Sequence, residues 1–119
     1  NPWPAPQQDA MAAWDYLMHL GYGADNVVLA GDSAGGNMAL VLAQALHSAG
    51  RRMPRRLVLF SPWTDMTSSG ESYQRCRDED PMVSLPYIQA VRSAYAPGQD
   101  WSRPEFSPPS ATSPAFPPP

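Results

Sequence analysis

One serine of the chain stands where it could act as a nucleophile. It lies in a G-x-S-x-G pattern extended by a further glycine, made of Gly31, Asp32, Ser33, Ala34, Gly35 and Gly36. A short apolar run over residues 27–30 ends just before this pattern, and a helical pattern starts at Ala34. A sharp turn between a strand and a helix lifts a serine Oγ above the edge of the sheet, which is the geometry of a nucleophile elbow. The pattern therefore predicts acyl transfer with Ser33 as the catalytic nucleophile.

Each neighbour of Ser33 has a predicted function in that turn. Gly31 and Gly35 lack Cβ atoms, so the strand and the helix can approach closely around a strained central residue. The first amides of a helix have no intrahelical partner, so the N–H of Ala34 is predicted to hold an oxyanion. Asp32 is expected to shape the turn, because its side chain should diverge from that of Ser33. A simpler interpretation makes Ser33 a helix N-cap and the glycines an ordinary tight turn.

The two histidines do not supply the base that such a serine needs. A catalytic histidine must reach the Oγ proton of the serine. His47 follows Ser33 by fourteen residues, which is about 20 Å along the same predicted helix. His19 precedes Ser33 and lies on the previous predicted helix. Both are therefore interpreted as helix-surface residues.

Other polar groups are predicted to be structural or solvated. Cys76 lies between two arginines but has no recognisable base as a partner. Residues 78–80 are three consecutive acids, and adjacent carboxylates cannot converge on a metal ion without further ligands. No metal or cofactor is therefore predicted. A basic cluster around Pro54 is expected to be a solvated loop; it consists of Arg51, Arg52, Arg55 and Arg56.

The elements that must position Ser33 follow from hydrophobic periodicity. A helix is predicted to start only after Pro2, Pro4 and Pro6 and to end at Gly21 or Gly23, with Trp14, Leu17 and Met18 in the core. Unbroken apolar runs over 27–30 and 57–60 predict two strands buried on both faces, with a helix over 34–49 between them. This order predicts parallel neighbouring strands and the α/β fold class. A further helix is predicted from Ser84 until Pro97, and residues 66–71 are predicted to form a loop.

Length and composition exclude several classes of protein. The chain has 119 residues, 15 prolines, one cysteine and a formal net charge of −3. A negative charge without a lysine-rich run argues against nucleic-acid binding. One cysteine cannot form an internal disulfide, and the apolar stretches are far shorter than the ~20 residues of a membrane span. Neither nucleic acid nor a membrane-spanning segment is therefore predicted.

Two segments of the sequence carry recognisable motifs: residues 31–37 read GDSAGGN, and residues 61–65 contain SPW-x-D. Both motifs resemble those of the hormone-sensitive-lipase-like branch of the α/β-hydrolase superfamily. A proline-rich lead with Asp9 forms a third match. Weaker matches are Ser72, Tyr73, Asp80, Tyr95, Ser107 and Pro108. The resemblance implies a partial α/β-hydrolase fold and a carboxylesterase or lipase-like activity on small-molecule esters, with Ser33 as nucleophile. It also implies that Asp65 supports the pocket and is not the triad acid.

The resemblance further implies that residues 1–119 are the central part of a single α/β-hydrolase domain. In the family, an HGGG segment upstream supplies other oxyanion donors, and an acid and a histidine downstream complete the triad. None of these is found in the sequence, and Pro117 and Pro118 resemble the prolines before the strand that leads to the acid. The 119 residues by themselves are therefore expected to be nearly inactive.

Two other functions are compatible with the sequence. The first is a ligand-binding or receptor-like relative that keeps the fold and the serine turn but does not hydrolyse esters. The second is a proline-rich interaction segment in the polyproline II conformation, formed by Pro104, Pro108, Pro109, Pro114 and residues 117–119. The agreement of Ser107 and Pro108 with family positions favours an irregular connection there.

Overall fold

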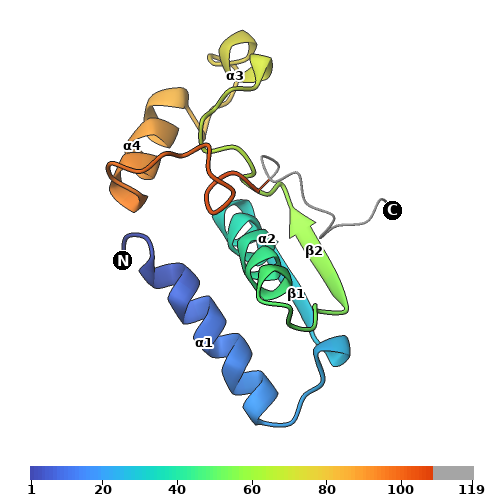
Figure 1. Ribbon diagram of the computed structural model, residues 1–119. Helices are drawn as coiled ribbons and strands as arrows, with labels where there is room; N and C mark the ends of the chain where they lie inside the picture. The colour runs from blue at the N-terminus through green and yellow to red at the C-terminus, as the bar shows by residue number, and fades with distance from the viewer. Residues whose placement is uncertain (109–119) are drawn as a thin grey trace.

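Two parallel strands and the helix that joins them form the centre of the molecule (Figure 1). The computed structural model describes residues 1–108. Strand β1 (Val28–Asp32) leads into helix α2 (Ser33–Ser48), which returns to strand β2 (Arg56–Phe60). The strands pair in parallel along their whole length, with Gly31 opposite Leu59. The predicted α/β class and strand order are thereby confirmed.

The remaining α-helices lie beside α2 and beyond the carboxyl ends of the strands (Figure 1). Helix α1 (Ala5–His19) packs along α2, and a 3₁₀ turn, η1 (Ala24–Asn26), precedes β1. Helices α3 (Glu71–Arg75) and α4 (Leu85–Tyr95) lie beyond the carboxyl ends of the strands (Figure 1). α4 is the helix predicted from Ser84, whose Oγ accepts a hydrogen bond from the N–H of Tyr87. The five-residue α3 was not predicted, because so short a helix leaves no apolar periodicity in the sequence.

The start of α1 differs from the prediction. The helix begins at Ala5 and includes Pro6 in its first turn. The amides of a first turn have no intrahelical acceptor, so a proline there forfeits no hydrogen bond and its fixed φ suits the helix. The prediction that all three early prolines precede the helix is therefore wrong. The end before Gly21 agrees with it.

A core between α1, α2 and β1 holds the two layers together. Trp14, Leu42 and Leu46 are buried in it, and Leu46 is completely inaccessible. Met18 and Leu29 are half-buried and pack against these residues. The prediction that Trp14 belongs to the core is confirmed.

Replacing Leu46 with alanine should destabilise the protein strongly. The substitution leaves a cavity in the α1–α2 layer, and such cavities cost about 2–5 kcal/mol. Urea denaturation of the protein would measure this loss. Leu20→Ala is the matched control, because Leu20 is 54% exposed at the end of α1 and should cost less than about 0.5 kcal/mol. Equal losses in both variants would contradict the assignment of this core.

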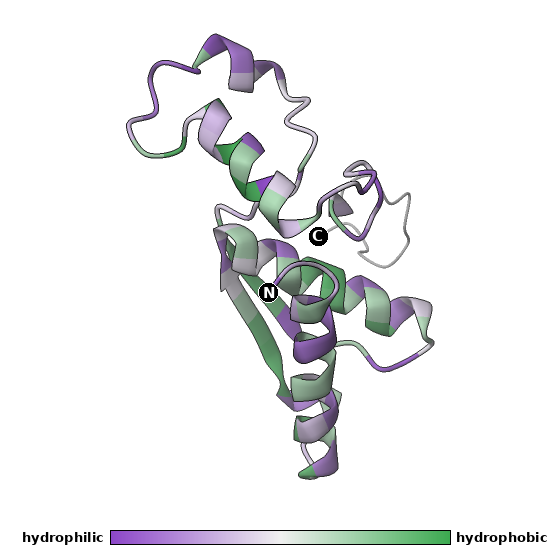
Figure 2. Cartoon of the chain, turned by 90° about the vertical axis from the view of Figure 1, so that its left-hand side faces the viewer, coloured by the Kyte–Doolittle hydropathy of each residue, from purple (hydrophilic) through white to green (hydrophobic). Residues whose placement is uncertain are grey.

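The two faces of the sheet differ, contrary to the prediction that both are buried. Side chains alternate along β1 and β2 between half-buried and exposed. The exposed face carries Val28, Val58 and Phe60, the last of which is 65% exposed. In Figure 2 the strands are coloured mainly as hydrophobic residues. The strands are apolar on both sides, as parallel strands usually are, but within residues 1–108 helices cover only one side.

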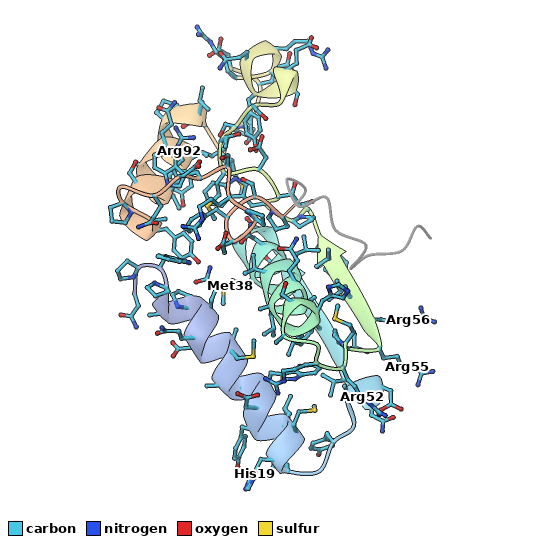
Figure 3. The ribbon with its side chains drawn as sticks, in the orientation of Figure 1. His19, Met38, Arg52, Arg55, Arg56 and Arg92 are labelled. Atoms are coloured by element: carbon cyan, nitrogen blue, oxygen red, sulfur yellow. The ribbon has the colours of Figure 1, made fainter. Side chains whose placement is uncertain are left out.

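A second cluster fixes α4 relative to the loop that follows β2. Met66, Ala96 and Phe106 are buried in it. Arg92 of α4, labelled in Figure 3, donates from Nη1 to the carbonyl oxygen of Met66 at 2.8 Å. Its guanidinium lies 4.2 Å from the ring centroid of Trp101, a cation–π contact. α4 is thereby held beside the carboxyl ends of the strands.

The proline-rich segment lies only partly within the described residues. Pro108 is buried, and its carbonyl oxygen accepts a hydrogen bond of 3.0 Å from the side chain of Gln44 in α2. A buried proline cannot serve as an exposed polyproline II ligand, which argues against that function at Pro108. Pro109, Pro114 and residues 117–119 lie outside the described part of the chain.

Candidate active site

Ser33 occupies a strained turn between β1 and α2. Its φ is +49°, in the left-handed region that costs a non-glycine residue about 1–2 kcal/mol. The N-cap of α2 is Asp32, and Asp32 makes no capping hydrogen bond with its side chain. The simpler interpretation of Ser33 as an N-cap is therefore wrong. Strain of this kind persists only where the surroundings hold it, and it is common at active sites.

Two glycines allow the close packing around this turn. A Cβ atom on Gly31 would overlap the carbonyl group of Gly35 and lie 2.7 Å from the backbone nitrogen of Gly36. A Cβ atom on Gly36 would lie 2.7 Å from Cβ of Pro62. Gly35 differs from the prediction, because a Cβ atom there would have its nearest contact, Asp32 Oδ1, at 3.9 Å. The close approach thus depends on Gly31 and Gly36.

The loop after β2 holds the serine turn from the other side. The backbone N–H of Trp63 donates to the carbonyl oxygen of Ser33 at 2.9 Å. Ser61, the first residue after β2, also has a positive φ, +42°. The indole Nε1 of Trp63 donates to the carbonyl oxygen of Asp65 at 3.1 Å, which fixes the ring. Two strained serines at the ends of neighbouring strands therefore face one site.

An open cleft of about 730 Å³ adjoins Ser33 and Ala34. One wall is the loop after β2, with Ser61, Pro62 and Trp63. The opposite wall is apolar and comes from α4 and the loop before it; it consists of Met82, Val83, Leu85, Ile88 and Val91. Ser72, Tyr73, Cys76, Arg77, Asp80 and Tyr87 complete the lining. Asp32 is not part of it, in keeping with a side chain that diverges from Ser33.

Most of this lining could not be predicted from the sequence. The sequence indicates that α4 is a helix, but the long separation between Ser33 and Ile88 along the chain gives no sign that they lie close together. Cys76 was considered alone, whereas the fold brings it to the cleft. A usable signal was the pair Ser72–Tyr73 in the family pattern. Burial, with a smaller contribution from the charge of Asp65, raises the pKa of Tyr73, so its phenol stays protonated at neutral pH.

Asp65 organises the loop that follows Trp63. Its carboxylate accepts two hydrogen bonds from Thr67 and two from Ser69, from the backbone N–H and the hydroxyl of each residue. Partial burial raises the pKa of Asp65, but these hydrogen bonds outweigh it and hold that pKa below the ordinary value of an aspartate. Asp65 is absent from the cleft lining. Its contacts fit a supporting residue rather than a proton-transfer group.

The Asp65→Asn variant should lose stability in a pH-dependent way. A lowered folded-state pKa means that the stabilisation is complete above the pKa of the unfolded chain and is lost as the pH falls through the folded value. We expect the variant to be less stable by about 1 kcal/mol at pH 7, with the difference shrinking below about pH 4. Denaturation of both proteins between pH 3 and 7 tests this. Asp9→Asn, at an exposed site of α1, is the control and should change little.

The two histidines lie away from Ser33. His19 is the last residue of α1, and Figure 3 places it at the end of the molecule opposite the start of α2. His47 is exposed in the last turn of α2, at the other end of the helix that Ser33 begins. Neither residue lines the cleft. The interpretation of both as helix-surface residues agrees with these positions.

The basic cluster does not line the cleft, whereas Asp80 of the acidic run does. Arg51 pairs with Asp15 at 2.6 Å across the α1–α2 layer. Figure 3 shows Arg52, Arg55 and Arg56 near the amino end of β2, the end remote from the serine turn.

Within residues 1–108, no three acidic, histidine or cysteine side chains are grouped to hold a metal ion. No helix of that part of the chain is both long and apolar enough to cross a membrane.

Known proteins share this fold and sequence. A family model described as alpha/beta hydrolase fold matches residues 1–119. An acetyl-hydrolase of Streptomyces hygroscopicus is 34% identical over 108 residues, which cover 91% of this chain and 36% of the relative. The chain thus spans about a third of the length of this relative.

Solved structures agree with the sequence comparison. An esterase from the bacterial hormone-sensitive lipase family superposes with a TM-score of 0.85 at 35% identity, over 91% of this chain and 36% of that one. EstE7, a hormone-sensitive-lipase homologue from a metagenome library, gives a TM-score of 0.87 at 33% identity, over 93% of this chain and 38% of that one. The two strands and their helices therefore form part of an α/β-hydrolase fold. The chain belongs to the hormone-sensitive-lipase branch of the α/β-hydrolase family, whose matched relatives hydrolyse carboxylic esters.

Proposed function

We propose that Ser33 is the nucleophile of a carboxylic ester hydrolase. The observation that carries this proposal is the strained φ of Ser33 at a strand-to-helix turn that opens on a cleft. The surroundings hold this conformation with the hydrogen bond from Trp63 and the close contact of Gly31 with Gly35. A serine that only connected a strand to a helix would need neither the strain nor the cleft.

In the proposed reaction, Ser33 Oγ attacks the ester carbonyl carbon while a base takes its proton. The tetrahedral intermediate places negative charge on the carbonyl oxygen, and the N–H of Ala34 is one donor for that oxyanion. The alcohol then leaves with a proton, and water attacks the acyl-enzyme to release the acid and restore Ser33. In this proposal the base is a histidine that is oriented by an acid. His19 and His47 do not serve as this base, because neither of them lines the cleft.

We further propose that residues 1–119 are the central part of one α/β-hydrolase domain. The chain spans about a third of its matched relatives, which leaves room for the missing triad residues and oxyanion donors. The exposed apolar face of the sheet, with Val28, Val58 and Phe60, supports the same conclusion, because a parallel sheet is normally covered on both faces. The 119 residues alone should therefore show almost no hydrolysis.

The proposed substrates are small-molecule esters with an apolar acyl or alcohol group. The cleft presents aliphatic side chains from α4 opposite the wall that contains Trp63. Apolar groups gain roughly 25 cal/mol for each Å² that such a wall removes from water. The mechanism requires no cofactor, since serine, base and oxyanion donors carry every step.

Labelling with a fluorophosphonate tests the proposal. The intact protein, with the segments that flank this chain, should form one covalent adduct, and peptide mapping should place it on Ser33. Ser33→Ala should abolish the adduct, and the 119-residue chain should react far more slowly. Absence of any adduct on the intact protein would overturn the proposal. Ester binding without an adduct would then favour a receptor-like function.

A further inference from the structure

Asn37 is a buried polar residue on the helix that Ser33 begins. It lies one turn after Ser33 in α2 and is only 2% exposed. Its Nδ2 donates to the carbonyl oxygen of Trp63 at 2.7 Å and to that of Phe106 at 2.8 Å. These acceptors are 26 and 69 residues away in the sequence. A single amide group therefore joins three separate segments beneath the cleft.

The contact with Trp63 bears directly on the serine turn. The N–H of Trp63 donates to the carbonyl oxygen of Ser33, and the carbonyl oxygen of the same residue accepts from Asn37. The backbone N–H and the backbone carbonyl oxygen of Trp63 are thus both hydrogen-bonded to residues in the first turns of α2. Pro62, the residue before Trp63, lies so close to Gly36 that a Cβ atom there would overlap it. The position of the Trp63 wall relative to Ser33 consequently depends on Asn37.

We propose that Asn37 is a positioning residue of the Ser33 site, which acts through Trp63 and does not touch the substrate. This inference rests on the proposed function of Ser33. An asparagine suits the task because its amide nitrogen carries two hydrogens, one for each carbonyl oxygen. An aspartate has the same size, but its carboxylate has no hydrogen to donate to the carbonyl oxygens of Trp63 and Phe106. The Trp63 wall of the cleft would therefore lose its hydrogen bond to α2. Displacements of about 1 Å in such supports can lower a rate by about 10²-fold.

Gln44 provides a matched comparison on the same helix. It stands two turns after Asn37, and its Nε2 donates to the carbonyl oxygen of Pro108 at 3.0 Å. Like Asn37, it connects α2 to the segment near Phe106. It differs from Asn37 in that, among residues 1–108, its side chain makes no hydrogen bond to Trp63 or to the loop after β2. A variant of Gln44 thus disturbs the connection to that segment without disturbing the cleft wall.

The experiment compares Asn37→Asp and Gln44→Glu in the intact protein. Titration of reactive sites with a fluorophosphonate gives kcat per active molecule, so a loss of folded protein alone does not lower it. We expect Asn37→Asp to lower kcat by about 10²-fold and to change KM by less than about threefold. Gln44→Glu should keep kcat within about threefold of the parent. Assays at least about 10 °C below each melting temperature keep the variants folded.

Two results would overturn the inference. One is a kcat for Asn37→Asp within threefold of the parent; the other is an equal loss in Gln44→Glu. If Asn37→Asp does not fold, Asn37→Ala replaces it under the same criteria, because alanine removes both donors without placing an acceptor against the two carbonyl oxygens. The parent protein separates the two proposals. Failure of the parent to react with the fluorophosphonate refutes the proposed function, whereas either of these two results with a reactive parent refutes only the function of Asn37.

Discussion

Replacing Ser33 with alanine in the intact protein is expected to lower kcat for ester hydrolysis by about 10⁴- to 10⁶-fold. Loss of the nucleophile removes the covalent pathway, and only substrate binding and the oxyanion donors remain to accelerate direct attack by water. The cleft should be unchanged, because Ser33 contributes its backbone carbonyl to the contact with Trp63 and alanine retains that group. Initial rates with a chromogenic ester, measured over a range of concentrations, would give kcat and KM separately.

The matched control for this experiment is Ser48→Ala. Ser48 ends the helix that Ser33 begins, and it is exposed. Its substitution should leave kcat within about twofold of the parent, since surface changes away from special features have small effects. Hydrolysis by Ser33→Ala at more than a tenth of the parental rate would show that another residue carries the reaction.

Replacing Gly31 with alanine is expected to destabilise the protein by at least about 3 kcal/mol. The new methyl group would overlap the carbonyl group of Gly35, which belongs to the backbone of the first helical turn. Backbone atoms cannot move aside as the end of a flexible side chain can. The strand and the helix would have to separate where they join, at Asp32 and Ser33, so we also expect the fluorophosphonate reaction to be lost.

Gly35→Ala is the control that separates two causes of the destabilisation expected for Gly31→Ala. It shows whether the overlap of the new methyl group with the backbone, rather than the loss of a glycine in this turn, destabilises the protein. A Cβ atom at residue 35 has no neighbour closer than 3.9 Å, and alanine is a better helix former than glycine. Its stability should therefore change by less than about 1 kcal/mol. Urea denaturation of the two variants, side by side with the parent, measures both effects. A Gly31→Ala protein as stable as Gly35→Ala would contradict the packing described for the turn.

The sequence predicted those features that depend on neighbours in the chain. The alternation of apolar runs and helical stripes predicted β1, α2, β2 and α4, and the chain order required the two strands to be parallel. The motif around Ser33 predicted a sharp turn at the end of β1, where the structure has a positive φ. Errors occurred where a local rule has an exception. Pro6 was excluded from α1, although the first turn of a helix tolerates proline.

Contacts between distant segments could not be predicted in this way. The apolar wall of the cleft comes from α4, which is far from Ser33 in the sequence. The two carbonyl oxygens that accept hydrogen bonds from Asn37 belong to residues 26 and 69 positions away from it. The polar Asn37 within the buried face of α2 was a signal of internal hydrogen bonding, but it did not identify the acceptors. The apolar runs of the two strands predicted that both faces of the sheet are buried. Within residues 1–108, however, helices cover only one of these faces.

The sequence by itself determined the α/β class, the place of Ser33 at a strand-to-helix turn and the family resemblance, because each depends on residue types at short and fixed spacings. Only the tertiary structure decided which surfaces meet at that serine. It showed that Gly31 and Gly36, and not Gly35, allow the close packing, and it brought the Trp63 loop and α4 to the same cleft. The physical reason is that packing and hydrogen bonding act between atoms close in space, and chain order does not record those distances.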